Sequence, residues 1–209
     1  MLNPQDKPAW IKKRSGKITA SRVGDIARRT QKGTPYSVWN DYVYEVLTER
    51  LTGQATEHFV SKPMQWGLDQ EDAAANYYAF ETGAELAFSD FVDHPVIPMC
   101  GASPDRLIGD DGLLEIKCPN TRNHILFLLS GDIERLGANY PWQIQWQLEC
   151  TGRKWCDFMC YDPRLPVHLQ SKVIRVERDQ EMIDQAAAAI IEAQAYITEK
   201  ENALKELAS

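Results

Sequence analysis

One stretch of this chain constrains its fold more than any other. Residues 109–112 read Gly-Asp-Asp-Gly, which is typical of a tight turn because glycine and aspartate tolerate the backbone angles that turns require. Short strand-like runs lie on both sides of this turn, within residues 101–118. The pattern predicts a β-hairpin centred on Asp110, and this register places Asp105 directly opposite Glu115.

Side-chain alternation divides the second strand of the predicted hairpin into two faces. Successive strand residues point to opposite sides of a sheet. Glu115 and Lys117 therefore share one face, and we expect the other face to join the core through Leu114, Ile116 and Cys118. Residues paired across strands stand roughly 5 Å apart at Cβ. Two opposed carboxylates at this distance repel each other unless a cation lies between them or one holds a proton.

These residue types favour a metal-dependent site that cleaves phosphodiester bonds. Carboxylate oxygens suit Mg²⁺ or Mn²⁺ better than Zn²⁺. Such a metal polarises a phosphoryl oxygen and lowers the pKa of a bound water, and Lys117 would position that water or an anionic oxygen. The backbone carbonyl of Ile116 is a candidate additional ligand. Glu71, an acid that interrupts an apolar helix stripe, is a candidate to hold a second ion together with Asp105.

Each part of this pattern also has an ordinary structural interpretation. A Glu-x-Lys pair on a strand is usually a surface ion pair, and Pro-Asp is common before a turn. Glu71 can equally lie at the edge of its helix stripe. The combination is far less expected by chance, because it needs an acid on a helix, Pro-Asp at one strand end and Glu-x-Lys in register on the next strand.

The remaining periodicity predicts one α/β (α+β) domain in which helices flank a central mixed sheet. Helices are expected at 21–29, with Ser21 as N-cap, and at 37–51, 63–82, 140–150 and 179–208. Strands are expected at 85–92, 95–100, 101–108, 112–118, 155–161 and 171–176. Without a visible linker or repeat, the single domain comprises a basic N-terminal segment at 7–32, a catalytic core at 60–176 and the C-terminal helix.

The net charge of −7 argues at first against a nucleic-acid partner. Residues 7–32, however, contain nine basic residues and one acidic residue, Asp25, so this segment carries +8 and the rest of the chain −15. Nucleic-acid phosphates require a local positive surface and not a positive total. Taken alone, such a segment is more often a solvated charged face.

Composition disfavours several other classes of protein. No apolar run approaches the roughly 20 residues that cross a bilayer, and residues 1–10 are polar and contain proline, unlike a signal peptide. We interpret the five cysteines, none at CxxC spacing, as reduced thiols of a cytoplasmic protein. The four histidines form no zinc pattern, and the absence of a GxxxxGK[ST] sequence argues against a nucleotide-driven motor.

Six stretches between residues 10 and 176 carry a resemblance to known proteins. They are Trp10…Arg14…Gly16-Lys-Ile-Thr19-Ala-Ser21, Trp66-Gly67…Glu71, Ala102-Ser-Pro-Asp105, Leu114-Glu-Ile-Lys-Cys-Pro119, Tyr140…Gln143-Ile-Gln145 and Tyr161-Asp-Pro-Arg164. The Asp…Glu-x-Lys set among them resembles the PD-(D/E)xK nuclease superfamily. The order of all six stretches resembles one family within it, that of lambda exonuclease and the YqaJ-like viral recombinases.

This resemblance implies a restriction-endonuclease-like core and a processive, ATP-independent exonuclease. Such an enzyme digests one strand of duplex DNA in the 5′→3′ direction and leaves a 3′ single-stranded overhang. The resemblance assigns metal binding to Asp105, Glu115 and Glu71, and activation of the attacking water to Lys117. It implies Mg²⁺, with two ions per site, and Mn²⁺ as a substitute.

Further residues acquire roles in DNA binding from the same resemblance. Arg14 matches the arginine that grips the terminal 5′-phosphate, with Ser21 and Gln143 as partners. A guanidinium fork suits phosphate geometry and charge, which agrees with that role. Lys32 is expected to contact DNA as well. Met64 aligns with an apolar residue that wedges between base pairs, although an ordinary core methionine is an equally good interpretation of its place in the stripe.

The resemblance also implies partners and a setting. It predicts a homotrimeric ring around double-stranded DNA, cooperation with a single-strand annealing protein, no membrane association, and a phage or prophage gene expressed in bacterial cytoplasm. Arg106 departs from the family pattern, in which glycine is frequent at this position. Its effect on the turn, or on a phosphate contact, is left open by the sequence.

Two other functions remain as alternatives. The chain could be a structure-specific or single-strand-specific endonuclease of the same superfamily, although its cysteines do not match the layout of relatives with iron–sulfur clusters. A non-catalytic module that binds DNA ends ranks lower, because all four expected catalytic residues are present. A covalently closed circular duplex separates the first alternative from an exonuclease, since an enzyme that needs an end leaves a circle intact.

Overall fold

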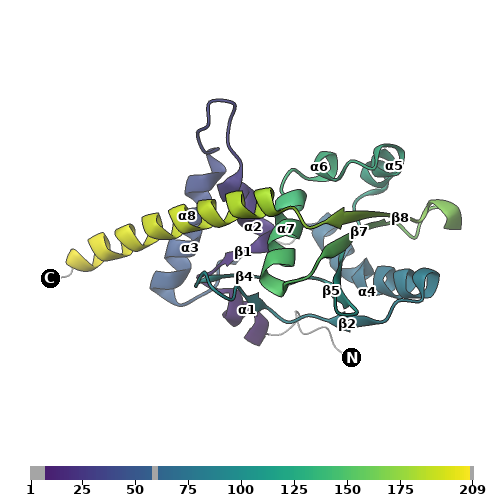
Figure 1. Ribbon diagram of the computed structural model, residues 1–209, viewed down its shortest axis with the longest axis horizontal. Coiled ribbons are helices and arrows are strands. Elements are labelled where there is room, and N and C mark those ends of the chain that lie inside the picture. The colour runs from purple at the N-terminus through teal and green to yellow at the C-terminus, as the bar shows by residue number, and fades with distance from the viewer. Residues whose placement is uncertain (1–7, 58–60, 208–209) are drawn as a thin grey trace.

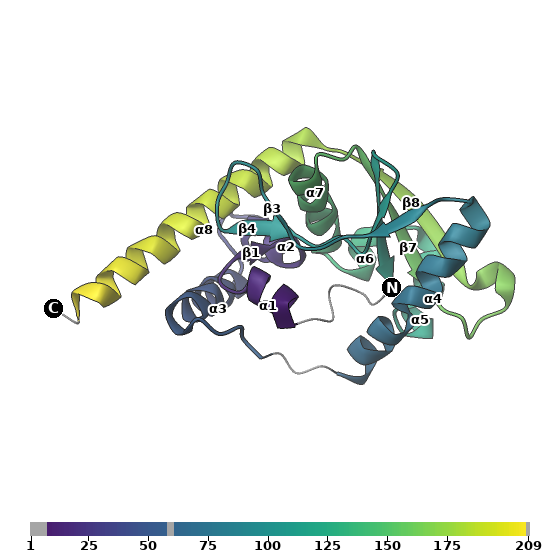
Figure 2. The same ribbon diagram turned by 90° about the horizontal axis from the view of Figure 1, so that it is seen from below.

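The computed structural model describes residues 8–57 and 61–207 of the chain. The predicted basic segment, catalytic core and C-terminal helix therefore begin or end partly outside the described residues, at residues 7, 60 and 208. The same holds for most of the polar N-terminal stretch at residues 1–10. Figures 1 and 2 show one mixed α/β domain, which confirms the predicted fold class.

A five-stranded mixed sheet forms the centre of the domain. Its strands, in spatial order, are β2 (Leu86–Phe88), β5 (Arg106–Ile108), β6 (Gly112–Lys117), β7 (Trp155–Tyr161) and β8 (Ser171–Glu177). Strands β6 and β7 run parallel, and the other neighbours are antiparallel. The predicted hairpin register is confirmed, because Arg106 pairs with Leu114 and Ile108 pairs with Gly112.

A second, smaller sheet lies beside the first. It contains β1 (Ile18–Thr19), β4 (Cys100–Ala102) and β3 (Val92–Asp93). The sequence predicted one strand over 101–108, but the chain leaves the small sheet after Ala102 and enters the large sheet at Arg106. Pro104 lies in this connection and has no N–H to give to a ladder, which explains the break. Asp105 thus stands at the junction of the two sheets.

The strand predicted at 95–100 is wrong. Two prolines in this segment, Pro95 and Pro98, lack the N–H groups that a ladder needs. The N–H groups of Val96 and Ile97 instead donate to Nδ1 of His94. The side chain of a neighbouring residue has therefore replaced a partner strand.

The helices follow the predicted pattern more closely. They are α1 (Pro8–Arg14), α2 (Ala20–Ala27), α3 (Val38–Thr52), α4 (Lys62–Thr82), α5 (Thr121–Ser130), α6 (Ile133–Leu136), α7 (Tyr140–Thr151) and α8 (Gln180–Glu206), with a short 3₁₀ turn, η2, at Val167–Leu169. The prediction of Ser21 as an N-cap is wrong, because Thr19 has the extended backbone of the N-cap and α2 begins at Ala20.

Apolar side chains cover both faces of the strand β6. On one face, Leu114 and Ile116 pack against Ala75 and Tyr78 of α4. On the other face, a separate cluster joins Leu113 to α7, α5 and β7. A strand that is buried on both sides can carry a charged residue only if partners satisfy it. The polar residues of β6 are therefore expected to have specific contacts.

Helix α2 lies tightly against α7, and this contact brings the N-terminal segment to the sheet. A Cβ atom at Gly24 would stand only 2.9 Å from the Cα atom of Asn139, so the absence of a side chain permits the approach. Helix α8 packs through Ile190 and Ile197 on the apolar cluster that also contains Val23 and Ile26 of α2. Its C-terminal end extends away from the body (Figure 1), and Leu204 is 43 % exposed. None of the helices described here is both long and apolar enough to span a bilayer.

Candidate active site

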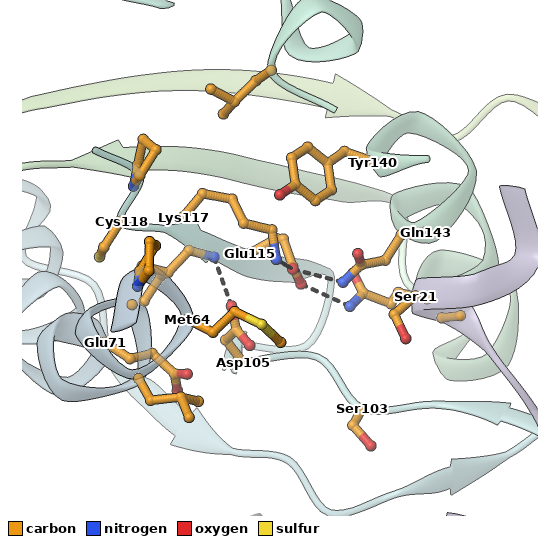
Figure 3. Close-up of a pocket in the computed structure, with 18 of the residues that line it drawn as sticks. Ser21, Met64, Glu71, Ser103, Asp105, Glu115, Lys117, Cys118, Tyr140 and Gln143 are labelled. Carbon is orange, nitrogen blue, oxygen red and sulfur yellow. Dashed lines mark hydrogen bonds and ion pairs between the residues drawn. The ribbon is translucent and has the colours of Figure 1, made fainter. Parts of the chain in front are cut away.

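A pocket of about 540 Å³ lies where α1, α2, α4 and α7 meet β6 and the junction of the two sheets. Figure 3 shows side chains from α2, α4, α7, β6 and the junction pointing toward a common space. The pocket brings together most of the residues that the sequence singled out, namely Arg14, Ser21, Met64, Glu71, Asp105, Glu115, Ile116, Lys117 and Gln143.

Asp105 is held across the hairpin in the predicted position. Its Oδ2 atom accepts a hydrogen bond of 2.7 Å from the backbone N–H of Ile116, which fixes the carboxylate beside β6. Burial raises the pKa of Asp105 well above its usual range, and the carboxylates of Glu115 and Glu71 raise it further. Lys117 and the Ile116 hydrogen bond act in the opposite direction. The net result is a cluster of acids that repel one another, a situation that a cation relieves.

Glu115 is the most completely bonded acid of the cluster. Only 1 % of its surface is exposed. Its Oε1 atom accepts a hydrogen bond of 2.6 Å from Gln143, and its Oε2 atom accepts one of 2.7 Å from Gln147. The ammonium group of Lys117 also donates to Oε1. The interpretation of Glu-x-Lys as a surface ion pair is therefore wrong, since the pair is enclosed in the site.

Gln147 is a residue of the site that was not predicted from the sequence. Gln143 and Gln147 are four residues apart on α7, so both amides lie on the face that meets β6 (Figure 3 labels the first). Polar residues at this spacing in a helix whose other side chains are buried were a usable signal. In this arrangement Gln143 is bonded to the acid cluster, while its predicted role beside a phosphate stays a prediction.

Lys117 remains a charged group inside the pocket. Burial by itself lowers the pKa of this lysine, but the carboxylates of Glu115 and Asp105 outweigh burial and the net pKa is raised. Its Nζ atom lies 4.8 Å from the centre of the Tyr140 ring, which supports the cation from the side. An ammonium held this way can orient a water molecule or a phosphoryl oxygen, and it is unsuited to act as a base.

Glu71 reaches the pocket from α4 and has a partner that the sequence did not predict. Its Oε1 atom accepts a hydrogen bond of 2.9 Å from Nη1 of Arg106. Burial raises the pKa of Glu71, although the neighbouring guanidinium opposes this effect. Arg106 itself is only 3 % exposed. It therefore forms a buried ion pair, which is neither of the two roles that the sequence left open.

The donor set fits a hard divalent cation. Three carboxylates line one pocket, and oxygen donors of this kind suit Mg²⁺ or Mn²⁺. Across the residues that the structure describes, no three acidic, histidine or cysteine side chains yet surround one point closely enough to hold a metal.

A basic region forms the opposite end of the pocket. The guanidinium of Arg14 lies 4.1 Å from the centre of the Trp10 ring, and the indole N–H of Trp10 donates to the hydroxyl of Ser103 over 3.2 Å. Burial lowers the pKa of Arg14, but an arginine stays protonated. No carboxylate of the described chain forms an ion pair with it. A partly buried guanidinium of this kind is suited to bind an anion.

The two remaining predicted DNA-binding residues differ in their placement. Met64 is 54 % exposed and lines the pocket, so the alternative of an ordinary core methionine is wrong. Lys32 lies in the exposed loop between α2 and α3 and is not part of the pocket. In Figure 1 this loop extends away from the body of the domain.

Solved structures resemble this chain over nearly its whole length. A crystal structure of LHK-Exo in complex with dAMP has 38% sequence identity and a TM-score of 0.88, and the match covers 97% of this chain and 98% of that one. A structure of the same alkaline exonuclease from Laribacter hongkongensis gives 38% identity, a TM-score of 0.83 and coverage of 96% and 100%. A phage-related exonuclease from Haemophilus somnus 129PT, at 15% identity, shares the fold with a TM-score of 0.76 and coverage of 93% and 99%. No curated protein sequence matches significantly.

The family to which these features point is also found by sequence. A model of the YqaJ-like viral recombinase domain matches residues 9–154, a range that contains every residue of the acid cluster and Arg14. The resemblance inferred from the six stretches is thereby confirmed, and the chain is a homologue of alkaline exonucleases. The chain belongs to the YqaJ-like viral recombinase domain family.

Proposed function

We propose that this protein is a phage-type DNA exonuclease that digests one strand of duplex DNA from its 5′ end. It would work processively and without ATP, and it would leave 3′ overhangs for recombination by strand annealing. The observation that carries this proposal is a single pocket with an acid cluster at one end and Arg14 at the other. The 38% identity to an alkaline exonuclease over nearly the whole chain supports the type of reaction.

The acid cluster is the proposed site for Mg²⁺, with two ions bound and with Mn²⁺ as a substitute. Asp105, Glu115, Glu71 and the carbonyl of Ile116 would hold the ions. When bound, the metal would activate water and stabilise charge on the phosphoryl group. Lys117 would orient the attacking water through its ammonium group.

The Arg14 end is the proposed site for the terminal 5′-phosphate. A terminal phosphate carries more negative charge than an internal one, and a guanidinium without a carboxylate partner can bind it through two parallel hydrogen bonds. Ser21 lines the same pocket and would add a hydroxyl donor, with Gln143 as a further contact. Met64, exposed at the rim, would enter between base pairs, and Lys32 would contact the backbone of the duplex.

The proposed partners and setting are those that the family resemblance suggests. We propose a homotrimeric ring around DNA, a single-strand annealing protein as partner, and action in the cytoplasm of a bacterium that carries a phage or prophage. A sedimentation measurement of the protein alone tests the trimer, since a monomer at micromolar concentration would contradict it.

The deciding experiment is digestion of a linear duplex labelled separately at each 5′ and 3′ end. The reaction contains Mg²⁺ and no ATP, and a covalently closed circle serves as the control. The proposal is supported if 5′-terminal nucleotides are released first from the linear duplex while the circle stays intact. Cleavage of the circle would favour an endonuclease, early loss of 3′ label would reverse the direction, and binding without digestion would favour a DNA-end-binding module.

A further inference from the structure

The side chain of Arg106 occupies the junction between the two elements that carry Glu71 and Asp105. It is the first residue of β5 and directly follows Asp105 in the chain. The guanidinium lies 4.2 Å from the centre of the Phe88 ring, on the neighbouring strand β2. A buried charged group requires specific partners, so the contacts of Arg106 indicate what it does.

The guanidinium joins α4 to the start of β5. Its Nη1 atom donates to Oε1 of Glu71 over 2.9 Å and to the backbone carbonyl of Asp105 over 2.6 Å. Its Nη2 atom donates to Asp72, whose side chain is 67 % exposed. One nitrogen therefore ties the carboxylate of Glu71 to the main chain of Asp105. Both of these acids line the pocket, whereas Arg106 and Asp72 do not.

The position of Glu71 along α4 makes this contact important. Farther along the helix, Ala75 and Tyr78 are packed on the large sheet. Toward its N-terminus, Met64 and Leu68 are largely exposed at the pocket. Glu71 lies between these two parts, at the point where packing of α4 on the sheet begins, and the ion pair sets its distance from the strand.

We propose that Arg106 is a positioning residue for the metal site, which holds the carboxylate of Glu71 next to Asp105 so that both acids can bind one set of divalent cations. This inference rests on the proposed function and adds a residue to it. A guanidinium cannot be a metal ligand, and its charge opposes a nearby cation. Its contribution must therefore come from the fixed placement of Glu71, as for other residues that orient metal ligands.

The test is Mn²⁺ binding by the purified protein without DNA, followed by electron paramagnetic resonance of the free ion. Arg106→Gln should weaken Mn²⁺ affinity roughly 10- to 100-fold. Glu71→Gln should weaken it as well, and the double variant should bind no more weakly than Glu71→Gln alone, because residues that act through one contact are not additive. Asp72→Asn is the matched control, since it removes the exposed partner of the same guanidinium, and its affinity should stay within about twofold of the wild type.

Two results would overturn the role of Arg106: unchanged Mn²⁺ affinity in Arg106→Gln, or an equal loss in the wild-type and Glu71→Gln backgrounds. The melting temperature without metal shows whether each variant is folded. If Arg106→Gln is unfolded, Arg106→Lys replaces it, because lysine keeps the charge but loses the fork, and an affinity equal to the wild type would then contradict the proposal. A wild-type protein that binds no Mn²⁺ would instead contradict the proposed function itself.

Discussion

At the acid end of the pocket, Glu115 accepts hydrogen bonds from three side chains, whereas at the basic end Arg14 stacks on the ring of Trp10 and forms no ion pair with a carboxylate of the described residues. The acid end is rigid before any ligand arrives, because each carboxylate is held by a defined donor. The basic end has a partly buried guanidinium, which interacts with the charge of Glu49 without forming an ion pair with it. A fixed site is useful for placing reacting groups, and an open charge is useful for capturing an anion from solution.

The variant with the largest expected effect on the digestion rate changes the acid end of the pocket. Lys117→Ala should lower the digestion rate at least about 100-fold, the usual scale for loss of a group that assists proton transfer or positions water. DNA binding should change little, because Lys117 is enclosed beside Glu115. Digestion of linear duplex and a gel-shift measurement check the two statements. Lys154→Ala is the control, since Lys154 pairs with Asp111 on the surface and should leave the rate unchanged.

The variant with the next largest effect changes the basic end of the pocket and, with it, the choice of DNA end. The preference for 5′-phosphorylated over 5′-hydroxyl ends should fall about 10- to 100-fold in Arg14→Ala, since a charged hydrogen bond contributes roughly 1.5–3 kcal/mol. The ratio of rates on the two substrates is the measurement. Arg22→Ala offers a comparison, because Arg22 is already paired with Asp25 and Glu45. An equal loss in both variants would mean that general positive charge, and not Arg14, selects the end.

A smaller effect concerns protein stability, and it tests whether the acids of the cluster repel one another when no metal is bound. The raised pKa of Asp105 means that the folded chain holds this proton more tightly than the unfolded chain. The contribution of Asp105 to the stability of the metal-free protein is therefore present at low pH and is lost as pH rises through its folded-state pKa. Asp105→Asn should raise the metal-free melting temperature by roughly 2–6 °C at pH 8, and stabilisation by Mg²⁺ should decrease. An Asp157→Asn variant, in which the lost carboxylate is paired with Arg175, should show a lower melting temperature.

The smallest effect concerns the rim. Met64→Ala should change unfolding free energy by less than about 0.5 kcal/mol, because the side chain is largely exposed. It should slow the start of digestion severalfold on blunt ends and less on ends with unpaired bases. Phe80→Ala, at another exposed position of α4 that does not line the pocket, is the matched control. If Met64→Ala begins to digest blunt ends at the wild-type rate, Met64 does not enter between base pairs.

The sequence predicted the site where chemistry and local geometry coincide. A Gly-Asp-Asp-Gly turn and strict alternation are enough to set the hairpin register, so the pairing of Asp105 with Glu115 was accessible. Helix ends also depend on local residues, since Gly53 and Gly83 adopt the left-handed backbone directly after α3 and α4. These features depend on few neighbouring residues.

Other features depend on contacts between distant segments. The ion pair of Arg106 with Glu71 joins residues 35 positions apart, and the bond of Gln147 to Glu115 joins residues 32 positions apart. No local periodicity encodes such pairs. The division of the predicted strand at Pro104 also required knowledge of two sheets, because proline alone is compatible with a strand edge.

The connection at residues 103–105 has a consequence for product length. Arg14 lies next to β1 of the small sheet, whereas Glu115 and Lys117 belong to the large sheet. Under the proposed function, the angle between the two sheets fixes the spacing from the gripped end to the reacting bond. The junction would then set the distance between these two sites, and insertions there would alter how many nucleotides are released in each step.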